Sequence, residues 1–284
     1  AHIKPAELIG NPEKVAEIKK ILADNNISVS AISCHGNPLH PNKETADKFH
    51  NDFKNAILVA ELLGVDTIIG FSGCPGDCDE SKNPNWVTCA WPNEYGDILK
   101  WQWEEKVIPY WKDMAEFAKS HNVTKIAFEM HPGFVVYNPE TLLKLREAVG
   151  DIIGANFDPS HLFWQGIDPV EAIRVIGKAG AMFHFHAKDT RIDPRNTAVN
   201  GVKTGAKTVE QKGVTNYLAG KTTISSGIQS IYKMLGGDEW LDGMLKDNSQ
   251  GAATYTGADI KAKFPVEGEA YASKLTAADV TDAT

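Results

Sequence analysis

The sequence predicts an α/β fold in which parallel strands alternate with covering helices. Three short apolar runs support this prediction, at residues 126–128, 152–157 and 181–183. Between them, Pro139–Val149 and Pro169–Gly180 carry leucine, isoleucine and valine at helical spacing. The resulting order of strand, helix, strand, helix, strand is typical of parallel strands whose connections pack against the sheet.

The same alternation is expected before this central region. The opening Ala1–Pro12 is expected to be extended, and a helix with one apolar face begins at Pro12. The alternating residues 27–32 predict a strand. A long helix over Lys43–Leu63 follows, and Gly64 is expected to end it.

The next strand is predicted at Thr67–Phe71, and it opens into a long irregular segment, Ser72–Asp97. Loops of this length usually have a function. After Arg191 the chain is rich in glycine, threonine, asparagine and lysine, and its pattern is weak. The elements expected there are helices at Ile228–Leu235 and Glu239–Leu245 and a short strand at Phe264–Glu269.

Composition and charge disfavour several classes of protein. The 284 residues suit one large domain, so we expect a single domain over residues 1–284. The net charge of −8 disfavours a nucleic-acid partner, because lysine and arginine carry phosphate binding. No run approaches the ~18 apolar residues of a membrane span, and the N-terminus lacks an export signal. Four cysteines do not make a disulfide framework in a chain of this size, so we expect a cytoplasmic protein.

Metal-binding side chains stand at the ends of the three central strands. Glu129 follows the first, Asp158 the second and His186 the third, at intervals of 29 and 28 positions, each about one strand–helix unit. Polar residues at the carboxyl ends of neighbouring parallel strands converge on one site. Two carboxylates and an imidazole suit a divalent cation such as Mn²⁺, Co²⁺ or Mg²⁺, and Zn²⁺ is less expected.

Other side chains near the strand ends are candidates for substrate contact. His35 lies in a loop after a predicted strand, and Lys188 either orients substrate or pairs with Asp189. His131 is open between a partner of the metal ligands and an ordinary loop residue, and His184 is expected to pack in the core.

Tryptophans and cysteines gather in and after the long irregular segment. Trp91 is a candidate for a lid over a sugar, although packing against the fold is the favoured role for most of these rings. A structural zinc site is disfavoured because only three cysteines are near one another, where four ligands are needed. They are Cys74, Cys78 and Cys89.

Five motifs in order resemble the sugar phosphate isomerase/epimerase family, the xylose isomerase-like TIM barrels. The resemblance covers about Ala1–Val202 and leaves residues 203–284 divergent. The motifs are Ser33-Cys34-His35-Gly36-Asn37-Pro38-Leu39-His40-Pro41, Phe71-Ser72-Gly73-Cys74-Pro75-Gly76, Ala127-Phe128-Glu129-Met130-His131-Pro132, Asp158-Pro159-Ser160-His161-Leu162-Phe163-Trp164 and His186-Ala187-Lys188-Asp189-Thr190-Arg191.

This resemblance implies a (β/α)₈ barrel and a full set of site residues. The family's first strand and helix normally precede a stretch like Ala1–Leu8, so the barrel is expected to lack that unit or to be closed by another chain. The implied metal ligands are Glu129, Asp158, His186 and Glu267, with Glu269 as the alternative fourth. The implied acid/base pair is Glu129 and Glu267, and the implied substrate contacts are His161 and Arg191.

The activity implied by the resemblance is that of a sugar isomerase or epimerase. It would move a proton or a hydride next to a carbonyl through a metal-stabilised enediolate, and the sequence does not choose between these routes. The expected partner is a small sugar or polyol, and the expected assembly is a homo-oligomer. The alternatives are a metal-dependent dehydratase or a C-glycoside or carbon–carbon lyase, a catalytically degraded sugar-binding subunit, and, least favoured, an endonuclease IV-like phosphodiesterase.

Overall fold

The computed structural model describes residues 3–89, 91–192, 197 and 206–209, in two compact units. The first unit holds the described residues of 1–24, 28–157 and 175–185. The second holds residues 25–27, 158–174 and the described residues from 186 onward. The boundary between the units therefore falls directly after two strands, between Phe157 and Asp158 and between Phe185 and His186.

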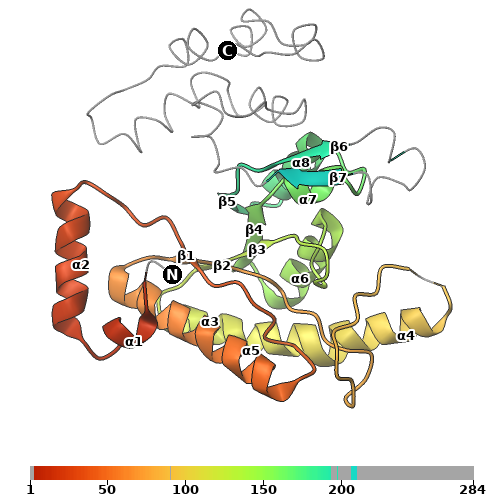
Figure 1. Cartoon of the computed structure of the whole chain (residues 1–284), viewed down its shortest axis with the longest axis horizontal. Coiled ribbons are helices and arrows are strands. Elements are labelled where there is room, and N and C mark those ends of the chain that lie inside the picture. Colours follow the sequence, from red (N-terminus) through yellow and green to blue (C-terminus); the bar gives the residue numbers. More distant parts are fainter. Residues whose placement is uncertain (1–2, 90, 193–196, 198–205, 210–284) are drawn as a thin grey trace, which may run out of the picture. The chain divides into compact units, whose positions relative to one another are not determined.

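The first unit is built on a five-stranded parallel sheet (Figure 1). Each strand pairs with the next one along the chain, in the order β1-β2-β3-β4-β5. This order confirms the predicted parallel α/β fold, and it is the order of strands in a TIM barrel. The strands are β1 (Ile32–Ser33), β2 (Thr67–Gly70), β3 (Lys125–Glu129), β4 (Ile153–Phe157) and β5 (Met182–Phe185).

Helices connect these strands and pack on the sheet. Helix α3 (Lys43–Leu63) packs on β1 and β2, and helix α6 (Pro139–Val149) packs on β4 (Figure 1). The side chain of Asn42 accepts a hydrogen bond from the Thr45 N–H at the start of α3, and Gly64 adopts φ 76° at its end. Both termini match the sequence prediction because capping residues mark them. The other helices of this unit are α1 (Pro5–Leu8), α2 (Pro12–Asp24), α4 (Glu94–Trp101), the π-helix η1 (Gln102–Val107) and α5 (Ile108–Ser120).

The core lies between the sheet and these helices. Trp111 of α5 is completely buried, and its ring packs edge-on against Phe53 and Phe128. Its indole N–H donates to the Ser72 carbonyl oxygen at 2.8 Å, which satisfies its one polar atom. Trp103 is also buried, so the packing role predicted for most tryptophans is confirmed for these two. The hydrogen bond of Trp111 to Ser72 fixes the start of the segment that follows β2.

Two predictions at the N-terminal end were wrong. The opening is not extended throughout, because Pro5–Leu8 form helix α1, in which proline occupies the first helical position. The predicted strand at residues 27–32 is reduced to Ile32–Ser33, where β1 pairs with β2. Alternation of apolar residues does not guarantee a strand where no ladder partner is present.

The second unit contributes the residues that follow β4 and β5. Helix α7 (Ser160–Phe163) comes directly after β4, and helix α8 (Pro169–Lys178) begins in this unit. Strand β6 (Asp189–Ile192) pairs antiparallel with β7 (Ala206–Val209). The elements predicted at 228–235, 239–245 and 264–269 lie outside the described residues. Across the described part of the chain, every helix is too short or too polar to span a lipid bilayer.

Candidate metal centre

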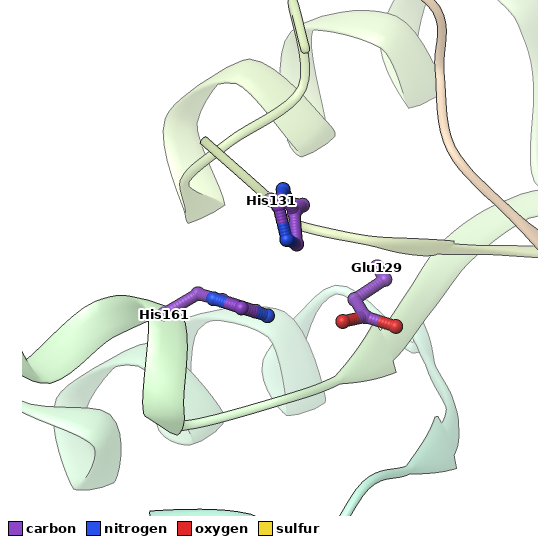
Figure 2. A group of neighbouring side chains, drawn as sticks. All are labelled: Glu129, His131 and His161. Atoms are coloured by element: carbon purple, nitrogen blue, oxygen red, sulfur yellow. The ribbon is translucent and has the colours of Figure 1, made fainter. Parts of the chain in front are cut away.

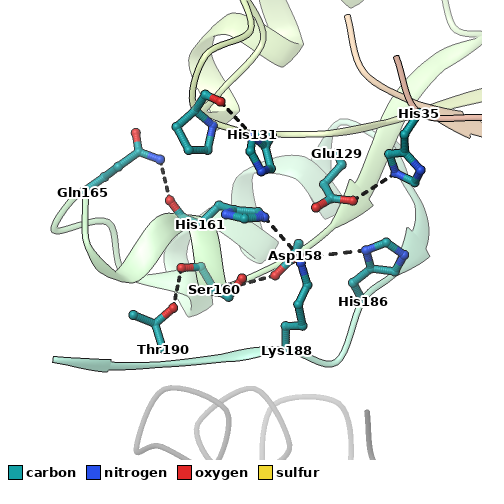
Figure 3. Close-up of polar contacts among 11 residues, drawn as sticks. His35, Glu129, His131, Asp158, Ser160, His161, Gln165, His186, Lys188 and Thr190 are labelled. Atoms are coloured by element: carbon teal, nitrogen blue, oxygen red, sulfur yellow. Dashed lines mark hydrogen bonds and ion pairs between the residues drawn. The ribbon is translucent and has the colours of Figure 1, made fainter. Parts of the chain in front are cut away.

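Glu129 ends β3 as a buried carboxylate paired with an imidazole. Its side chain is 4 % exposed, and its Oε2 lies 3.2 Å from Nε2 of His35 (Figure 3). The other ring nitrogen of His35, Nδ1, lies 3.0 Å from the hydroxyl of Ser33 on β1. The ends of β1 and β3, the strands on either side of β2, therefore hold one hydrogen-bonded row of Ser33, His35 and Glu129.

His131 follows Glu129 by two residues, and a hydrogen bond holds its ring in a defined orientation (Figure 3). Nδ1 of His131 lies 2.7 Å from the Pro132 carbonyl oxygen. Because a carbonyl only accepts, Nδ1 must carry the proton, and in the neutral ring Nε2 keeps its lone pair. The ring centroid of Phe71 lies 5.0 Å from that of His131 and 4.6 Å from that of His35, so Phe71 packs against both imidazoles.

Asp158, in the second unit, is fully buried and has its two oxygens in different surroundings. The Ser160 N–H donates to Oδ1 at 2.9 Å. Oδ2 instead faces three nitrogen atoms (Figure 3): Lys188 Nζ at 2.8 Å, His161 Nε2 at 3.5 Å and His186 Nδ1 at 3.8 Å. A buried ionised carboxylate has to be paired with a positive charge or bound to a metal ion, and Lys188 provides the pairing here.

The pKa of Asp158 reflects these contacts. Burial alone raises the pKa, since it penalises the charged form. The hydrogen bond with His186, the charge of His161 and the hydrogen bonds with Lys188 and Ser160 act in the opposite direction and hold the pKa below its ordinary value. The carboxylate is therefore ionised at neutral pH, as metal binding requires.

Hydrogen bonds around helix α7 fix these side chains. The Thr190 hydroxyl on β6 donates to the Ser160 carbonyl oxygen at 2.6 Å, and the Gln165 amide donates to that of His161 at 2.6 Å (Figure 3). The Lys188 N–H donates to the His186 carbonyl oxygen at 2.9 Å, which forms a tight turn. Asp158, His161, His186 and Lys188 are thus held together within one unit.

Glu129, Asp158 and His186 each stand at, or directly after, the end of a strand of the sheet. Glu129 pairs with Asn156 on β4, and Phe157 pairs with Phe185 on β5. Asp158 and His186 are the residues that directly follow this last pair. All three therefore follow the carboxyl ends of strands that are adjacent in the sheet, and their donor atoms are of the kinds that bind divalent cations.

The described residues contain two groups of ligand-bearing side chains that could hold a metal ion. One consists of Glu129, Asp158 and His186, and the other of Glu129, His131 and His161 (Figure 2). Neither group includes a cysteine, and all four cysteines of the chain are free thiols.

The remaining predicted residues are less defined. Trp91 is 75 % exposed. Arg191 lies in β6, but its side chain is not among the described groups, and Glu267 and Glu269 lie outside the described residues. His184 is half-buried and not a packed core residue, because its ring nitrogens lie 3.0 Å from Asn156 Oδ1 and 3.2 Å from Ser30 Oγ.

Sequence reasoning missed two contacts. Lys188 pairs with Asp158, where substrate contact or pairing with Asp189 was predicted, and His35 contacts Glu129 through a row that begins at Ser33. A signal existed for the second contact, because Ser33 and His35 are two residues apart at a strand end. Nothing in the sequence indicated the first.

Comparison with known proteins gives matches over most of the chain. A family model described as xylose isomerase-like TIM barrel matches residues 7–216. The uncharacterized protein YfiH of Bacillus subtilis is 43 % identical over 204 residues, which cover 71 % of this chain and 64 % of YfiH. The chain therefore matches less than two thirds of the length of that relative.

Two solved structures share the fold at low sequence identity. The probable 3-DHS dehydratase AsbF of Bacillus anthracis, described as involved in petrobactin synthesis, superposes with a TM-score of 0.52 and 17 % identity, over 91 % of this chain and 84 % of AsbF. A xylose isomerase domain protein from Planctomyces limnophilus gives a TM-score of 0.51 and 17 % identity, over 79 % of this chain and 70 % of that protein.

Proposed function

The chain belongs to the xylose isomerase-like TIM barrel family, and from this premise we propose that it is a divalent-metal-dependent sugar isomerase or epimerase. The observation that carries the proposal is the donor set at the carboxyl edge of the sheet. Glu129, Asp158 and His186 stand at or directly after the ends of β3, β4 and β5. Active sites of TIM barrels lie at this edge.

We propose Glu129, Asp158 and His186 as three ligands of one Mn²⁺, Co²⁺ or Mg²⁺ ion, with Glu267 as the fourth. The fit rests on the chemistry of the donors, two carboxylates and an imidazole, and on the buried Asp158 carboxylate, which the Ser160 N–H anchors through Oδ1 and which would bind the ion through Oδ2. When bound, the ion would polarise the substrate carbonyl and stabilise negative charge on the neighbouring oxygens.

The side chains of the protein would supply binding and proton transfer. Glu129 would take the proton from the carbon next to the carbonyl, and Glu267 would return a proton on the opposite side. Burial of Glu129 excludes water from its carboxylate, and His35 orients it. His35, His161, Lys188, Arg191 and Trp91 are the proposed contacts to the hydroxyl groups of a sugar or polyol.

Deuterium exchange tests this proposal and distinguishes proton transfer from hydride shift. The protein would be incubated in D₂O with Mn²⁺ and a panel of free and phosphorylated ketoses, and the sugars followed by NMR. Epimerisation with deuterium at the inverted carbon supports proton transfer by Glu129, and conversion without deuterium indicates a hydride shift. Loss of water from a substrate would instead identify a dehydratase.

The matched control is Glu129→Gln, which keeps the size of the side chain and removes its basicity. Conversion that persists in this variant would exclude Glu129 as the base. If wild-type protein loaded with Mn²⁺ converts none of the sugars, the isomerase assignment fails.

A further inference from the structure

Lys188 makes the shortest of the three contacts to Oδ2 of Asp158. Its Nζ lies 2.8 Å from Oδ2, closer than the ring nitrogens of His161 and His186. Asp158 is fully buried, whereas the Lys188 side chain is 25 % exposed. The lysine thus reaches a buried carboxylate from a position with access to solvent.

We propose that Lys188 is an internal cation that neutralises Asp158 in the metal-free protein and is displaced when a divalent ion binds. The inference rests on the proposed metal centre, and it adds that Lys188 and the divalent ion compete for Asp158. Both cations would use the same oxygen of Asp158, so each weakens the binding of the other.

The charge balance of Asp158 explains why such a cation is needed. An ionised carboxylate without a partner is very costly to bury, and one short ion pair offsets much of this cost. The two imidazoles lie farther from Oδ2 than the Lys188 ammonium does. Lys188 is therefore the closest counter-charge of Asp158.

The local structure lets Lys188 move while Asp158 stays in place. The Ser160 N–H holds Oδ1 of Asp158 at 2.9 Å, so the carboxylate is anchored through its other oxygen. The Lys188 ammonium sits on a flexible four-carbon stem and can withdraw toward solvent. The turn closed by the Lys188 N–H and the His186 carbonyl oxygen keeps the lysine backbone beside the proposed ligand. Once displaced, the ammonium becomes available to an oxygen of the substrate.

This competition predicts opposite effects on metal affinity and on the stability of the metal-free protein. Replacing Lys188 by an uncharged residue should lower the Kd for Mn²⁺ roughly tenfold, because the ion no longer has to displace the ammonium from Asp158. A tenfold change in Kd corresponds to about 1.4 kcal/mol of binding free energy. The same change should lower the Tm of the metal-free protein, because Asp158 loses its counter-charge. A residue that only stabilised the fold would lower the Tm without tightening metal binding.

The test is titration calorimetry with Mn²⁺ on EDTA-treated wild-type protein and Lys188→Met, with Tm measured in EDTA. Lys188→Met keeps most of the stem and removes the charge, and Lys188→Gln is the second variant if the first does not fold. Lys188→Arg retains the charge and should bind Mn²⁺ less tightly than Lys188→Met. The control Lys20→Gln removes one charge from an exposed ion pair with Asp24 on α2 and should match wild type.

The outcomes separate the inference from the metal centre on which it rests. Tighter Mn²⁺ binding in Lys188→Met, together with a lower Tm in EDTA, supports the competition. Equal or weaker binding in Lys188→Met than in wild type overturns it and leaves the metal centre standing. If neither wild type nor any variant binds Mn²⁺, the metal centre fails and the competition fails with it.

Discussion

His35 and Glu129 form a direct contact between the ends of two strand units, with Nε2 of the imidazole 3.2 Å from Oε2 of the carboxylate. Glu129 is buried, whereas the His35 side chain is 32 % exposed. The Ser33 hydroxyl at the other ring nitrogen fixes the orientation of the imidazole. The buried carboxylate proposed as the base is thus oriented by a partner that solvent can reach.

Replacing His35 should therefore act mainly on the rate of turnover. In His35→Ala, Glu129 loses a partner that orients it, and kcat should fall ~10–100-fold, the usual effect of removing a hydrogen-bond partner of a metal ligand. Steady-state kinetics separates kcat from KM. His121→Ala is the matched control, since it removes a histidine that pairs with Glu61 at the surface. A rise in KM at unchanged kcat would leave His35 with its proposed substrate contact alone and would exclude the orienting role.

Glu129→Gln should abolish turnover while the fold stays intact. Loss of a general base typically lowers kcat ~10²–10⁴-fold. The amide has nearly the size of the carboxylate and can still contact His35, so the circular dichroism spectrum should match that of wild type. Turnover at the wild-type rate would remove Glu129 from the mechanism.

The four cysteines should divide into two reactivity classes. Burial raises the pKa of the Cys34 thiol to about 11 and that of Cys74 to about 12, whereas Cys78 and Cys89 are exposed. Because the thiolate is the reactive form, Cys78 and Cys89 should react quickly with a disulfide reagent at neutral pH, and Cys34 and Cys74 only after the protein unfolds. Mass spectrometry of the labelled peptides identifies them. Rapid labelling of Cys34 or Cys74 in the folded protein would contradict the described packing.

Trp111 and Trp91 should differ sharply in their contribution to stability. Trp111→Leu removes a completely buried ring and its hydrogen bond to Ser72, and should cost roughly 3 kcal/mol of unfolding free energy. Trp91→Leu, at a site that is 75 % exposed, should change it by less than about 0.5 kcal/mol. Urea unfolding measures both. Similar losses in the two variants would show that Trp111 is not the packing residue that the structure describes.

The sequence predicts the fold well where the residues at the two ends of a helix mark its start and its end. Helix α3 begins after Asn42 and ends before Gly64, and α6 begins at Pro139 after Asn138, which caps it. These signals act within a few residues, so they are legible without the tertiary structure. The strand predicted at 27–32 has no such signal, and its pairing depends on residues far along the chain.

The places of the proposed ligands at the strand ends were predictable from the sequence, but their contacts were not. The positions of Glu129, Asp158 and His186 follow from the regular spacing of strands and helices. In a parallel sheet, each strand with its connecting helix brings the chain back to begin the next strand in the same direction. The pairing of Lys188 with Asp158 depends on a turn that the Lys188 N–H closes, and the sequence gives no sign of it.

The most direct test of the metal centre is anomalous X-ray scattering from crystals grown with Mn²⁺. The account predicts one anomalous peak about 2.0–2.3 Å from carboxylate oxygens of Glu129 and Asp158 and a ring nitrogen of His186. No peak at these side chains in saturating Mn²⁺, or a peak bound by other residues in their place, would contradict it.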